Sequence, residues 1–422
     1  MDVKEIKSAR PVTPDDVKVL RRTVEDIIQA VGAGGDEAIA QYSQKFDGYG
    51  GPFRVTDEQI DAAKKELSTE LIEGLDFAIQ QVTAFAKVQR AQITEFEQEI
   101  APGVYMGHRL IPLDSCAAYV PAGRYPCATS AVMSLVPAVV AGVTRIVAVS
   151  SPGREKRINP AILYTMAVVG ATEIYCLGGA HAIAAMALGT ETIAPVDMIV
   201  GPGNQYIMEA KRQLFGTVGI DFLAGPSECM VIADETGRAD YIAADLLAQC
   251  EHDPQARGAF VTTSEQLAVK VVEEIERQLR ELATEDVARQ SWEDKGIVVV
   301  VPTLADAAAY ANDYAPEHLE IHTTDPKALV PRLTSYGSLF LGESAAEVFA
   351  DKVSGTNHIL PTARAARYTG GLWVGHFLKV ITHQWVDESG VQLLAPYSAR
   401  QAEFETMDAH RRAALIRLTG KA

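Results

Sequence analysis

The chain has 422 residues, 48% of them hydrophobic and 22% charged, which is typical of a globular protein with more than one domain. Its formal net charge of -17 excludes non-specific attraction to nucleic acids and to anionic membrane surfaces, because both are negatively charged. The five cysteines are scattered and form neither a disulfide framework nor a CxxC pattern, so we expect a cytoplasmic protein with reduced thiols.

The N-terminal part of the chain is predicted to be mostly helical. Its first residues lack the apolar core of a signal peptide, and no apolar run in the chain is long enough for a membrane span. Apolar residues recur at helical spacing over 17–31 and 71–85, and a strand-like stretch near 104–112 indicates a short hairpin. We expect residues 1–115 to form a helical segment that packs on an α/β core.

Short apolar strands alternate with helices from residue 116 onward. Strands are predicted at 117–120, 146–150, 174–177, 198–200 and 230–233, with helices at 130–141, 160–169, 182–188 and 206–214. The pattern returns with strands at 259–262, 297–301, 319–322 and 338–341 and helices at 267–282, 304–312 and 326–334. Such alternation favours parallel sheets with helices on their faces. The sequence therefore predicts an α/β fold with two successive α/β domains, 116–235 and 236–362.

The alternation fades after Pro361, and a last helical stretch is predicted over 398–418. A tail of this length that carries a candidate ligand, His410, must fold back or reach a neighbouring subunit. We expect residues 363–422 to form a helical tail that reaches the partner subunit.

A candidate metal site centres on Gln249 and His252. If residues 240–252 are helical, these two side chains lie three apart on one face, where side chains are neighbours. A zinc site with a working coordination position takes three or four ligands, often from separate segments, and Asp351 and His410 would complete the set. Each histidine taken singly also fits a hydrogen-bonded structural residue, and spacing alone does not decide between these readings.

Two glycine-rich turns, at 178–181 and 201–204, each follow a predicted strand and open a predicted helix. Free N–H groups at a helix start can bind phosphate. The GxGxxG fingerprint is absent, so each turn also fits a tight strand-to-helix connection. Ser227 lies in a similar turn, where it either contacts substrate or caps the turn.

Glu317 and His318 place an acid beside a potential general base, just before a predicted strand. Histidine titrates near neutrality and is the commonest proton acceptor in enzymes, and a neighbouring glutamate can orient water. Beside a zinc ion the pair gains significance, because a zinc-bound alcohol loses its proton readily and can then give up hydride.

Short motifs along the chain together resemble the histidinol dehydrogenase family over nearly its whole length. These are Tyr119-Val120-Pro121, Gly178-Gly179-Ala180, Gly201-Pro202-Gly203-Asn204, Glu209-Ala210-Lys211-Arg212, Ala224-Gly225-Pro226-Ser227-Glu228, Ala248-Gln249-Cys250-Glu251-His252, Ala315-Pro316-Glu317-His318-Leu319, Gly355-Thr356-Asn357-His358 and Ala409-His410. The resemblance implies an intertwined homodimer with two incomplete Rossmann-like domains and one zinc ion per active site. It also implies a four-electron oxidation of an alcohol through an aldehyde to a carboxylate, with two NAD+ used in succession.

Matched by motif position, the resemblance implies a role for each site residue. The implied zinc ligands are Gln249, His252 and Asp351 from one subunit and His410 from the other, with His318 as the implied base and Glu317 as the residue that activates water. The family holds NAD at the positions of Tyr119, His181 and Asn204. It holds substrate at the positions of Ser227, His358 and Glu405, together with His318 and the four zinc ligands.

Departures from the family pattern bear on the substrate. Members that oxidise histidinol usually carry Gln at the place of His181, a pair of Ser at Gly370-Gly371, an acidic residue at His376 and a Tyr-Pro-Ser type run where this chain has 127–130. Residues 368–374 and 336–343 instead resemble the sulfopropanediol 3-dehydrogenase branch, which oxidises 2,3-dihydroxypropane-1-sulfonate to sulfolactate.

A sulfonate keeps its negative charge at every working pH, so basic partners are expected, since charge-assisted hydrogen bonds are the stronger ones. Candidates are Arg124, His181, His376 and Lys379, which also fit surface positions or contacts with NAD phosphates. Glu405 argues against an anionic substrate, because a nearby carboxylate repels it. Three alternatives stay open: L-histidinol as the substrate, a metallohydrolase that needs no NAD, and a non-catalytic scaffold with a structural metal.

Overall fold

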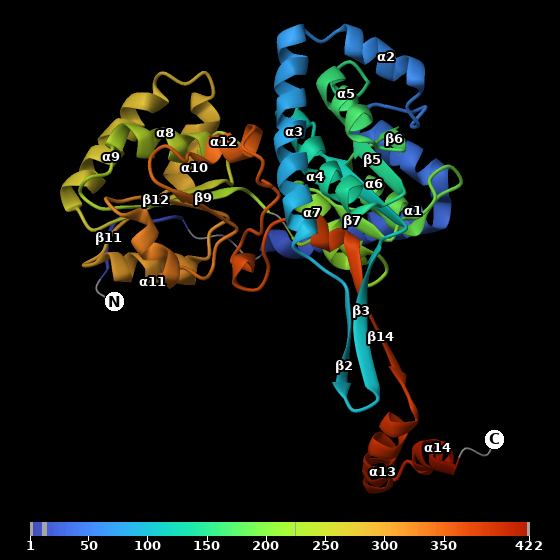
Figure 1. The fold of residues 1–422 in the computed structure, drawn as a ribbon. Coiled ribbons are helices and arrows are strands. Elements are labelled where there is room, and N and C mark those ends of the chain that lie inside the picture. The colour runs from blue at the N-terminus through green and yellow to red at the C-terminus, as the bar shows by residue number, and fades with distance from the viewer. Residues whose placement is uncertain (1–2, 11–14, 224, 420–422) are drawn as a thin grey trace. The chain divides into compact units, whose positions relative to one another are not determined.

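A computed structural model describes residues 3–10, 15–223 and 225–419, and the chain falls into two compact units (Figure 1). The first unit comprises Met1–Val88 and Leu113–Phe377, and the second comprises Gln89–Pro112 and Leu378–Ala422. Among the described residues, no helix combines the length and apolar character needed to cross a membrane.

The first unit contains a five-stranded sheet in which every strand runs parallel to its neighbours. Its strands are β4 (Ser115–Val120), β5 (Arg145–Ser150), β6 (Glu173–Cys176), β7 (Met198–Val200) and β8 (Gly219–Ile220), in the order β6-β5-β4-β7-β8. The strand order reverses between β4 and β7. In open α/β sheets, ligands bind beyond the carboxyl ends of the strands at such a reversal.

Helices cover both faces of this sheet. They are α4 (Ala128–Ala141), α5 (Pro160–Val169), α6 (Gly179–Leu188) and α7 (Gln205–Leu214), joined by α1 (Asp15–Asp47), α2 (Asp57–Lys65) and α3 (Thr69–Ala91). One apolar core joins α1, α6 and α7 to the sheet. The helix ends follow local chemistry: Asn159 caps α5 ahead of Pro160, and left-handed Gly170 ends it.

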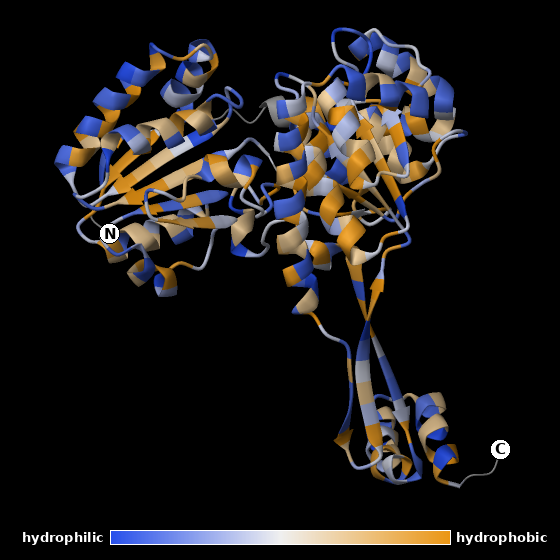
Figure 2. Cartoon of the chain, turned by 45° about the horizontal axis from the view of Figure 1, so that its top comes forward, coloured by the Kyte–Doolittle hydropathy of each residue, from blue (hydrophilic) through white to orange (hydrophobic). Residues whose placement is uncertain are grey.

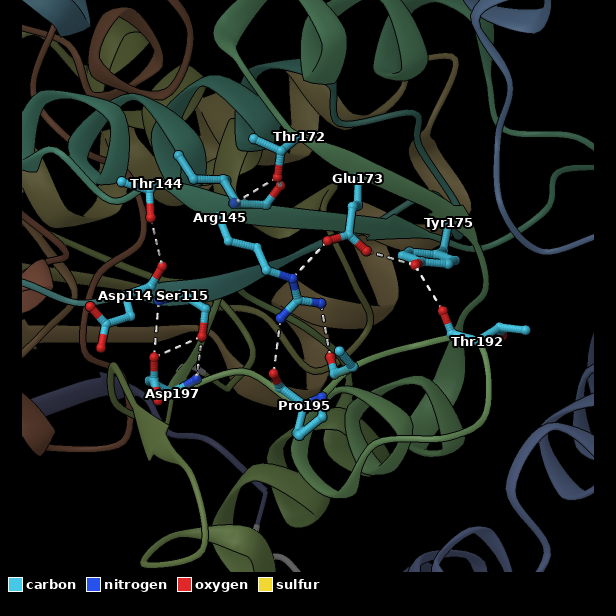
Figure 3. Close-up of polar contacts among 12 residues, drawn as sticks. Asp114, Ser115, Thr144, Arg145, Thr172, Glu173, Tyr175, Thr192, Pro195 and Asp197 are labelled. Carbon is cyan, nitrogen blue, oxygen red and sulfur yellow. Dashed lines mark hydrogen bonds and ion pairs between the residues drawn. The ribbon is translucent and has the colours of Figure 1, made fainter.

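Polar contacts brace the amino ends of the same strands (Figure 3). Asp197 accepts hydrogen bonds from the amide and hydroxyl of Ser115, at 2.9 and 2.7 Å. Arg145 donates to Glu173 at 2.7 Å and to the carbonyl oxygens of Ala194 and Pro195, both at 2.9 Å. The amino edge of the sheet is thus joined by the protein's own groups, which leaves the carboxyl edge for a ligand.

A six-stranded sheet forms the second part of the first unit, in the order β1-β11-β10-β9-β12-β13. Its strands are β9 (Glu228–Ala233), β10 (Arg257–Thr262), β11 (Ile297–Val300), β12 (His318–His322) and β13 (Ser338–Leu341), all parallel, with β1 (Lys4–Lys7) antiparallel at the edge. The strand order reverses between β9 and β12. Parallel sheets and helix alternation confirm the predicted α/β class.

Each face of this sheet has its own apolar core. One core involves α8 (Ala239–Cys250), α9 (Glu265–Leu279) and α10 (Glu285–Lys295). The other core involves α11 (Leu304–Tyr314) and the 3₁₀ helix η1 (Pro326–Arg332). Three short helices come later in the chain: α12 (Glu347–Lys352), η2 (Ala365–Arg367) and η3 (Val374–Phe377). Figure 2 shows hydrophobic strands flanked by helices with hydrophilic outer faces. The amphipathic patterns read from the sequence follow from this layering.

Successive side chains of β12 point to opposite faces of the sheet, so apolar and titratable residues separate onto different faces. Leu319 and Ile321 belong to the core with α11. His318, Glu320 and His322 occupy the opposite face, because they pair in register with the residues of β9 that pack under α8. A buried strand therefore carries three titratable side chains along one face.

The second unit combines a three-stranded antiparallel sheet with two helices. The strands are β2 (Phe96–Ala101), β3 (Val104–Pro112) and β14 (Leu378–Val386), and α13 (Glu388–Phe404) packs on α14 (Asp408–Thr419). The hairpin predicted near 104–112 is confirmed. The helical stretch predicted over 398–418 is present as parts of two helices, and the first of them begins earlier, at Glu388. Strand β14 was missed, since its partner β3 is far away in the sequence.

Candidate active site

Glu317 and His318 are held by the peptide groups of one residue, Glu228, at the start of β9. The Glu228 amide donates to Oε2 of Glu317 at 2.8 Å, and Nδ1 of His318 lies 3.1 Å from the Glu228 carbonyl oxygen. A carbonyl oxygen only accepts, so Nδ1 carries the proton and Nε2 presents a lone pair. Parallel pairing of β9 with β12 places Glu228 beside the pair, a role that its place in the Ala224–Glu228 motif did not reveal.

Burial sets the protonation of this pair. Glu317 is 5% exposed and His318 is 3% exposed. Burial lowers the pKa of His318 to about 4, so its ring is neutral near pH 7. Burial also raises the pKa of Glu317 well above its usual range. Nε2 of His318 has no hydrogen-bond partner among the described residues and lies 3.6 Å from Oε1 of Glu347, a residue that sequence reasoning missed.

Gln249 and His252 come from the end of α8. The condition that residues 240–252 be helical is met only in part, because the helix ends at Cys250, with Glu251 as its C-cap. His252 lies in the following turn, where its amide donates to the Gln249 carbonyl at 3.3 Å. Gln249 is 1% exposed, and its Oε1 has no partner among the described residues. An unpaired buried amide oxygen is costly unless a ligand meets it, which fits a metal donor.

Asp351 and His358 form a second group in the first unit. Nδ1 of His358 lies 2.8 Å from Oδ1 of Asp351 and 2.9 Å from its carbonyl oxygen, and Lys352 pairs with the same carboxylate. Although burial opposes it, the neighbouring His358 and Lys352 hold the pKa of Asp351 below its usual range. Nε2 of His358 lies 3.1 Å from Oγ of Ser130 on α4. Ser130 belongs to the run 127–130 that departs from the family pattern, so this run contacts a candidate substrate residue.

The charge of Asp351 acts on His252. Burial lowers the pKa of His252, and the nearby Asp351 carboxylate opposes that shift. Gln249, His252 and Asp351 thus offer an amide oxygen, an imidazole and a carboxylate within the first unit, donors that suit zinc. The other expected ligand, His410, is exposed on α14 of the second unit, and Glu405 is exposed at the end of α13.

The residues expected to hold NAD lie at carboxyl ends of strands in the five-stranded sheet. The Tyr119 hydroxyl lies 3.4 Å from Oγ of Ser151 and accepts from the Gly179 amide at 3.4 Å. The N-cap residue of α6, Gly178, has no side chain that could cap the helix, so within the described residues only the Gly179 amide of its first turn has this side-chain partner. Asn204 instead caps α7 by accepting from the amides of Tyr206 and Ile207.

His181 is fully buried on α6. Its ring stacks with Tyr42 at 6.0 Å and lies 6.1 Å from the ring of Phe46. Neither ring nitrogen has a partner among the described residues, and burial lowers the pKa to about 4. The ring is therefore uncharged near pH 7, which disfavours it as a cationic partner for a sulfonate.

A buried ion pair supports the glycine turn after β7. The side chains of Lys211 and Asp221 are both 0% exposed and pair with each other. Lys211 also donates to the Gly201 carbonyl at 3.0 Å, and Asp221 accepts from the Gly201 amide at 2.9 Å. These contacts explain Lys211 of the Glu-Ala-Lys-Arg motif, whose role the sequence alone did not reveal.

The remaining candidates are spread over the chain. Ser227 is half-buried in the turn before β9, and its carbonyl accepts from the Arg257 amide at 2.9 Å; Ala224 of the same motif lies outside the described residues. Arg124 is exposed, whereas burial lowers the pKa of His376. Lys379 lies on β14 in the second unit.

Comparison with known proteins gives consistent results. The family description "Histidinol dehydrogenase" matches residues 11–418. The "Histidinol dehydrogenase homolog" of Shouchella clausii is 42% identical over 99% of this chain and 98% of that protein, and the "Sulfopropanediol 3-dehydrogenase" of Ruegeria pomeroyi is 39% identical over 99% and 97%. The crystal structure of histidinol dehydrogenase from Elizabethkingia anophelis superposes with a TM-score of 0.92 at 35% identity, covering 97% of this chain and 94% of that one.

Proposed function

Because the chain belongs to the histidinol dehydrogenase family and is an NAD-dependent oxidoreductase, we propose that it oxidises a primary alcohol through an aldehyde to a carboxylate, with zinc in the site and two NAD+ used in succession. The observation that carries this proposal is the joint orientation of Glu317 and His318 by the peptide groups of Glu228.

His318 is suited to take the proton of the alcohol. Its Nδ1 hydrogen is committed to the Glu228 carbonyl, its ring is neutral, and its Nε2 has no hydrogen-bond partner in the described part of the chain, so the lone pair is available to a hydroxyl. Gln249, His252, Asp351 and His410 are the proposed zinc ligands, and zinc bound there would lower the pKa of the alcohol and polarise the carbonyl that follows.

Glu317 is the proposed residue for water activation in the aldehyde stage. One carboxylate oxygen accepts from the Glu228 amide, which holds the group in place and leaves the other oxygen for water. A carboxylate with a raised pKa binds a proton more firmly than an exposed one, as general-base work near neutral pH requires. Tyr119, His181 and Asn204 remain the residues proposed to hold NAD at the carboxyl edge of the five-stranded sheet, which has a Rossmann-like strand order.

For the substrate, we propose 2,3-dihydroxypropane-1-sulfonate, oxidised to sulfolactate, with L-histidinol as the alternative. The Ruegeria pomeroyi relative named sulfopropanediol 3-dehydrogenase supports the first. Exposed Arg124 is the cation best suited to a sulfonate, since His181 is neutral. Relatives of similar identity named histidinol dehydrogenase support the alternative, as does the carboxylate of Glu405, which would attract the amino group of histidinol.

We further propose a homodimer in which His410 and Glu405 complete the site of the partner subunit. Supporting this, α13 and α14 of the second unit expose large apolar side chains: Tyr397 is 60% exposed, Phe404 is 91% exposed and Ile416 is 55% exposed. Large apolar side chains with this much exposure are typical of residues that a partner covers.

A screen for NADH formation tests the proposal. Purified, zinc-loaded protein is supplied with NAD+ and either dihydroxypropanesulfonate or histidinol, and the NADH formed per alcohol consumed is counted. Two NADH per sulfonate alcohol supports the proposal, and two per histidinol supports the alternative. Turnover without NAD+ would indicate a metallohydrolase, and zinc binding with no turnover of any alcohol would indicate a scaffold.

A further inference from the structure

A second group of titratable side chains lies apart from the residues assigned above. Asp245 comes from α8, and Glu320 and His322 come from the same face of β12. Asp245 is 8% exposed, Glu320 is 0% exposed and His322 is 1% exposed. One ligand atom from each residue lies within 4.8 Å of the others. A helix and a buried strand therefore present two carboxylates and an imidazole to one point.

The distances suit a shared cation. Nε2 of His322 lies 3.2 Å from Oε2 of Glu320 and 4.0 Å from Oδ2 of Asp245. Ligand atoms that share a metal ion at about 2.0–2.2 Å are themselves separated by roughly 3 to 4 Å. The side chain of Asp245 is 11% exposed, which gives an ion a route from solvent.

Several polar atoms of this group lack a hydrogen-bond partner within the described part of the chain. Both ring nitrogens of His322 and Oε2 of Glu320 have no hydrogen-bond partner among the described residues. The other oxygen of Glu320 accepts from the Glu347 amide at 2.7 Å, which fixes the direction of the carboxylate. Buried donors and acceptors without partners are rare and destabilising, so a ligand for the free atoms would remove a real cost.

The position of the group in the sheet also favours a bound ligand. His322 ends β12 and pairs with Ala233 at the end of β9, so the group lies at the carboxyl side of the point where the strand order reverses. This is where open α/β sheets bind ligands. Glu317 and His318 lie at the opposite, amino end of the same two strands.

We propose that Asp245, Glu320 and His322 bind a divalent transition-metal cation, at a site separate from Gln249, His252 and Asp351. One imidazole with two carboxylates suits zinc or manganese. The electrostatics agree, because burial and the charge of Glu320 raise the pKa of Asp245 to about 9, and a cation would relieve that repulsion. Three protein ligands leave further coordination positions for water.

Zinc content measured by mass spectrometry tests this site with a readout other than activity. Protein stripped of metal is reloaded with zinc and dialysed, for the wild type and for His322→Gln, Glu320→Gln and His252→Ala. His383→Gln is the matched control, because His383 also pairs with a glutamate, Glu97 at 2.9 Å, but its side chain is 38% exposed and belongs to the second unit. Circular dichroism verifies that each variant is folded.

We expect two zinc equivalents per chain in the wild type and the control. His322→Gln and Glu320→Gln should each lose one equivalent and keep the other, and His252→Ala should lose only the other. If folded His322→Gln and Glu320→Gln both retain the wild-type zinc content, the proposal is overturned, and the three side chains form a structural cluster that binds no metal. A failure of the proposed catalytic zinc is distinguishable, since it would leave the content of His252→Ala unchanged.

Discussion

The amide of Glu228 donates a hydrogen bond of 2.8 Å to Oε2 of Glu317, while the carbonyl of the same residue faces Nδ1 of His318 at 3.1 Å. One peptide unit at the start of β9 thus orients two adjacent side chains at the start of β12. Since both strands are buried and parallel, the pair has little freedom to turn away.

This arrangement predicts that Glu317→Gln separates the two oxidation stages. The amide oxygen of Gln can still accept from Glu228, so the position is kept while proton acceptance is lost. Alcohol oxidation should persist, and aldehyde oxidation should fall by about 10²–10⁴-fold. Stopped-flow NADH formation, with the aldehyde supplied directly, measures the second stage. Glu281→Gln, at a side chain that is 67% exposed, is the control. Equal loss in both stages would contradict the assigned role.

The buried pair of Lys211 and Asp221 should contribute strongly to stability. Lys211→Met removes the cation and leaves an uncompensated buried carboxylate, which costs about 3–5 kcal/mol. Urea unfolding followed by circular dichroism measures the loss. Lys270→Met, at an exposed position, should change stability by less than about 0.5 kcal/mol. A small effect of Lys211→Met would mean that water or a counter-ion already reaches the pair.

Gly201 and Gly216 allow a matched test of close backbone approach. Both have positive φ, +110° and +99°, so alanine strains either one. A Cβ at Gly201 would collide with the Tyr119 carbonyl oxygen, whereas nothing lies within 4 Å of one at Gly216. Gly201→Ala should therefore lower the free energy of unfolding by about 1–3 kcal/mol more than Gly216→Ala does. Equal losses would show that the turn moves to accommodate a side chain.

The buried ring of His181 should make the folded protein less stable at acidic pH. Burial lowers its folded pKa from 6.5 to about 4, so the unfolded chain takes up a proton first as the pH falls. Its contribution is complete above pH 6.5 and declines down to about pH 4. At pH 5, roughly 1.5 units below the unfolded pKa, the loss is about 2 kcal/mol. Urea unfolding of wild type and His181→Gln at pH 8 and pH 5 measures it. The variant should lack this part of the decline, and parallel declines would contradict the assignment.

A shared active site predicts complementation between two inactive variants. His252→Ala and His410→Ala should each abolish turnover in a homodimer. Random mixing produces heterodimers in half of the molecules, each with one intact site, so about a quarter of the wild-type activity should return. NADH formation after co-expression measures it, with two different affinity tags to isolate the heterodimer. An inactive heterodimer would contradict a site completed by the partner's His410.

The sequence by itself determined the fold class of this protein and many of its candidate site residues. The alternation of apolar strands and helices from residue 116 predicted the α/β class, because burying one face of each element against another leaves few patterns. Local patterns, such as an acid beside a histidine or a glycine turn before a helix, pointed to some of the chemistry-bearing residues, and the resemblance to a known family supplied the roles of the others. The sequence analysis missed strand β14, because its one partner in the sheet, β3, is distant in the sequence.

The tertiary structure alone decided which groups act on one another. Parallel pairing brings the peptide of Glu228 to Glu317, 89 positions away, and the packing of α8 over β12 brings Asp245 to His322, 77 positions away. Burial then sets charge, leaving the rings of His181 and His318 neutral. Such effects depend on distance and on exclusion of water, and neither quantity is written in the order of residues along a chain.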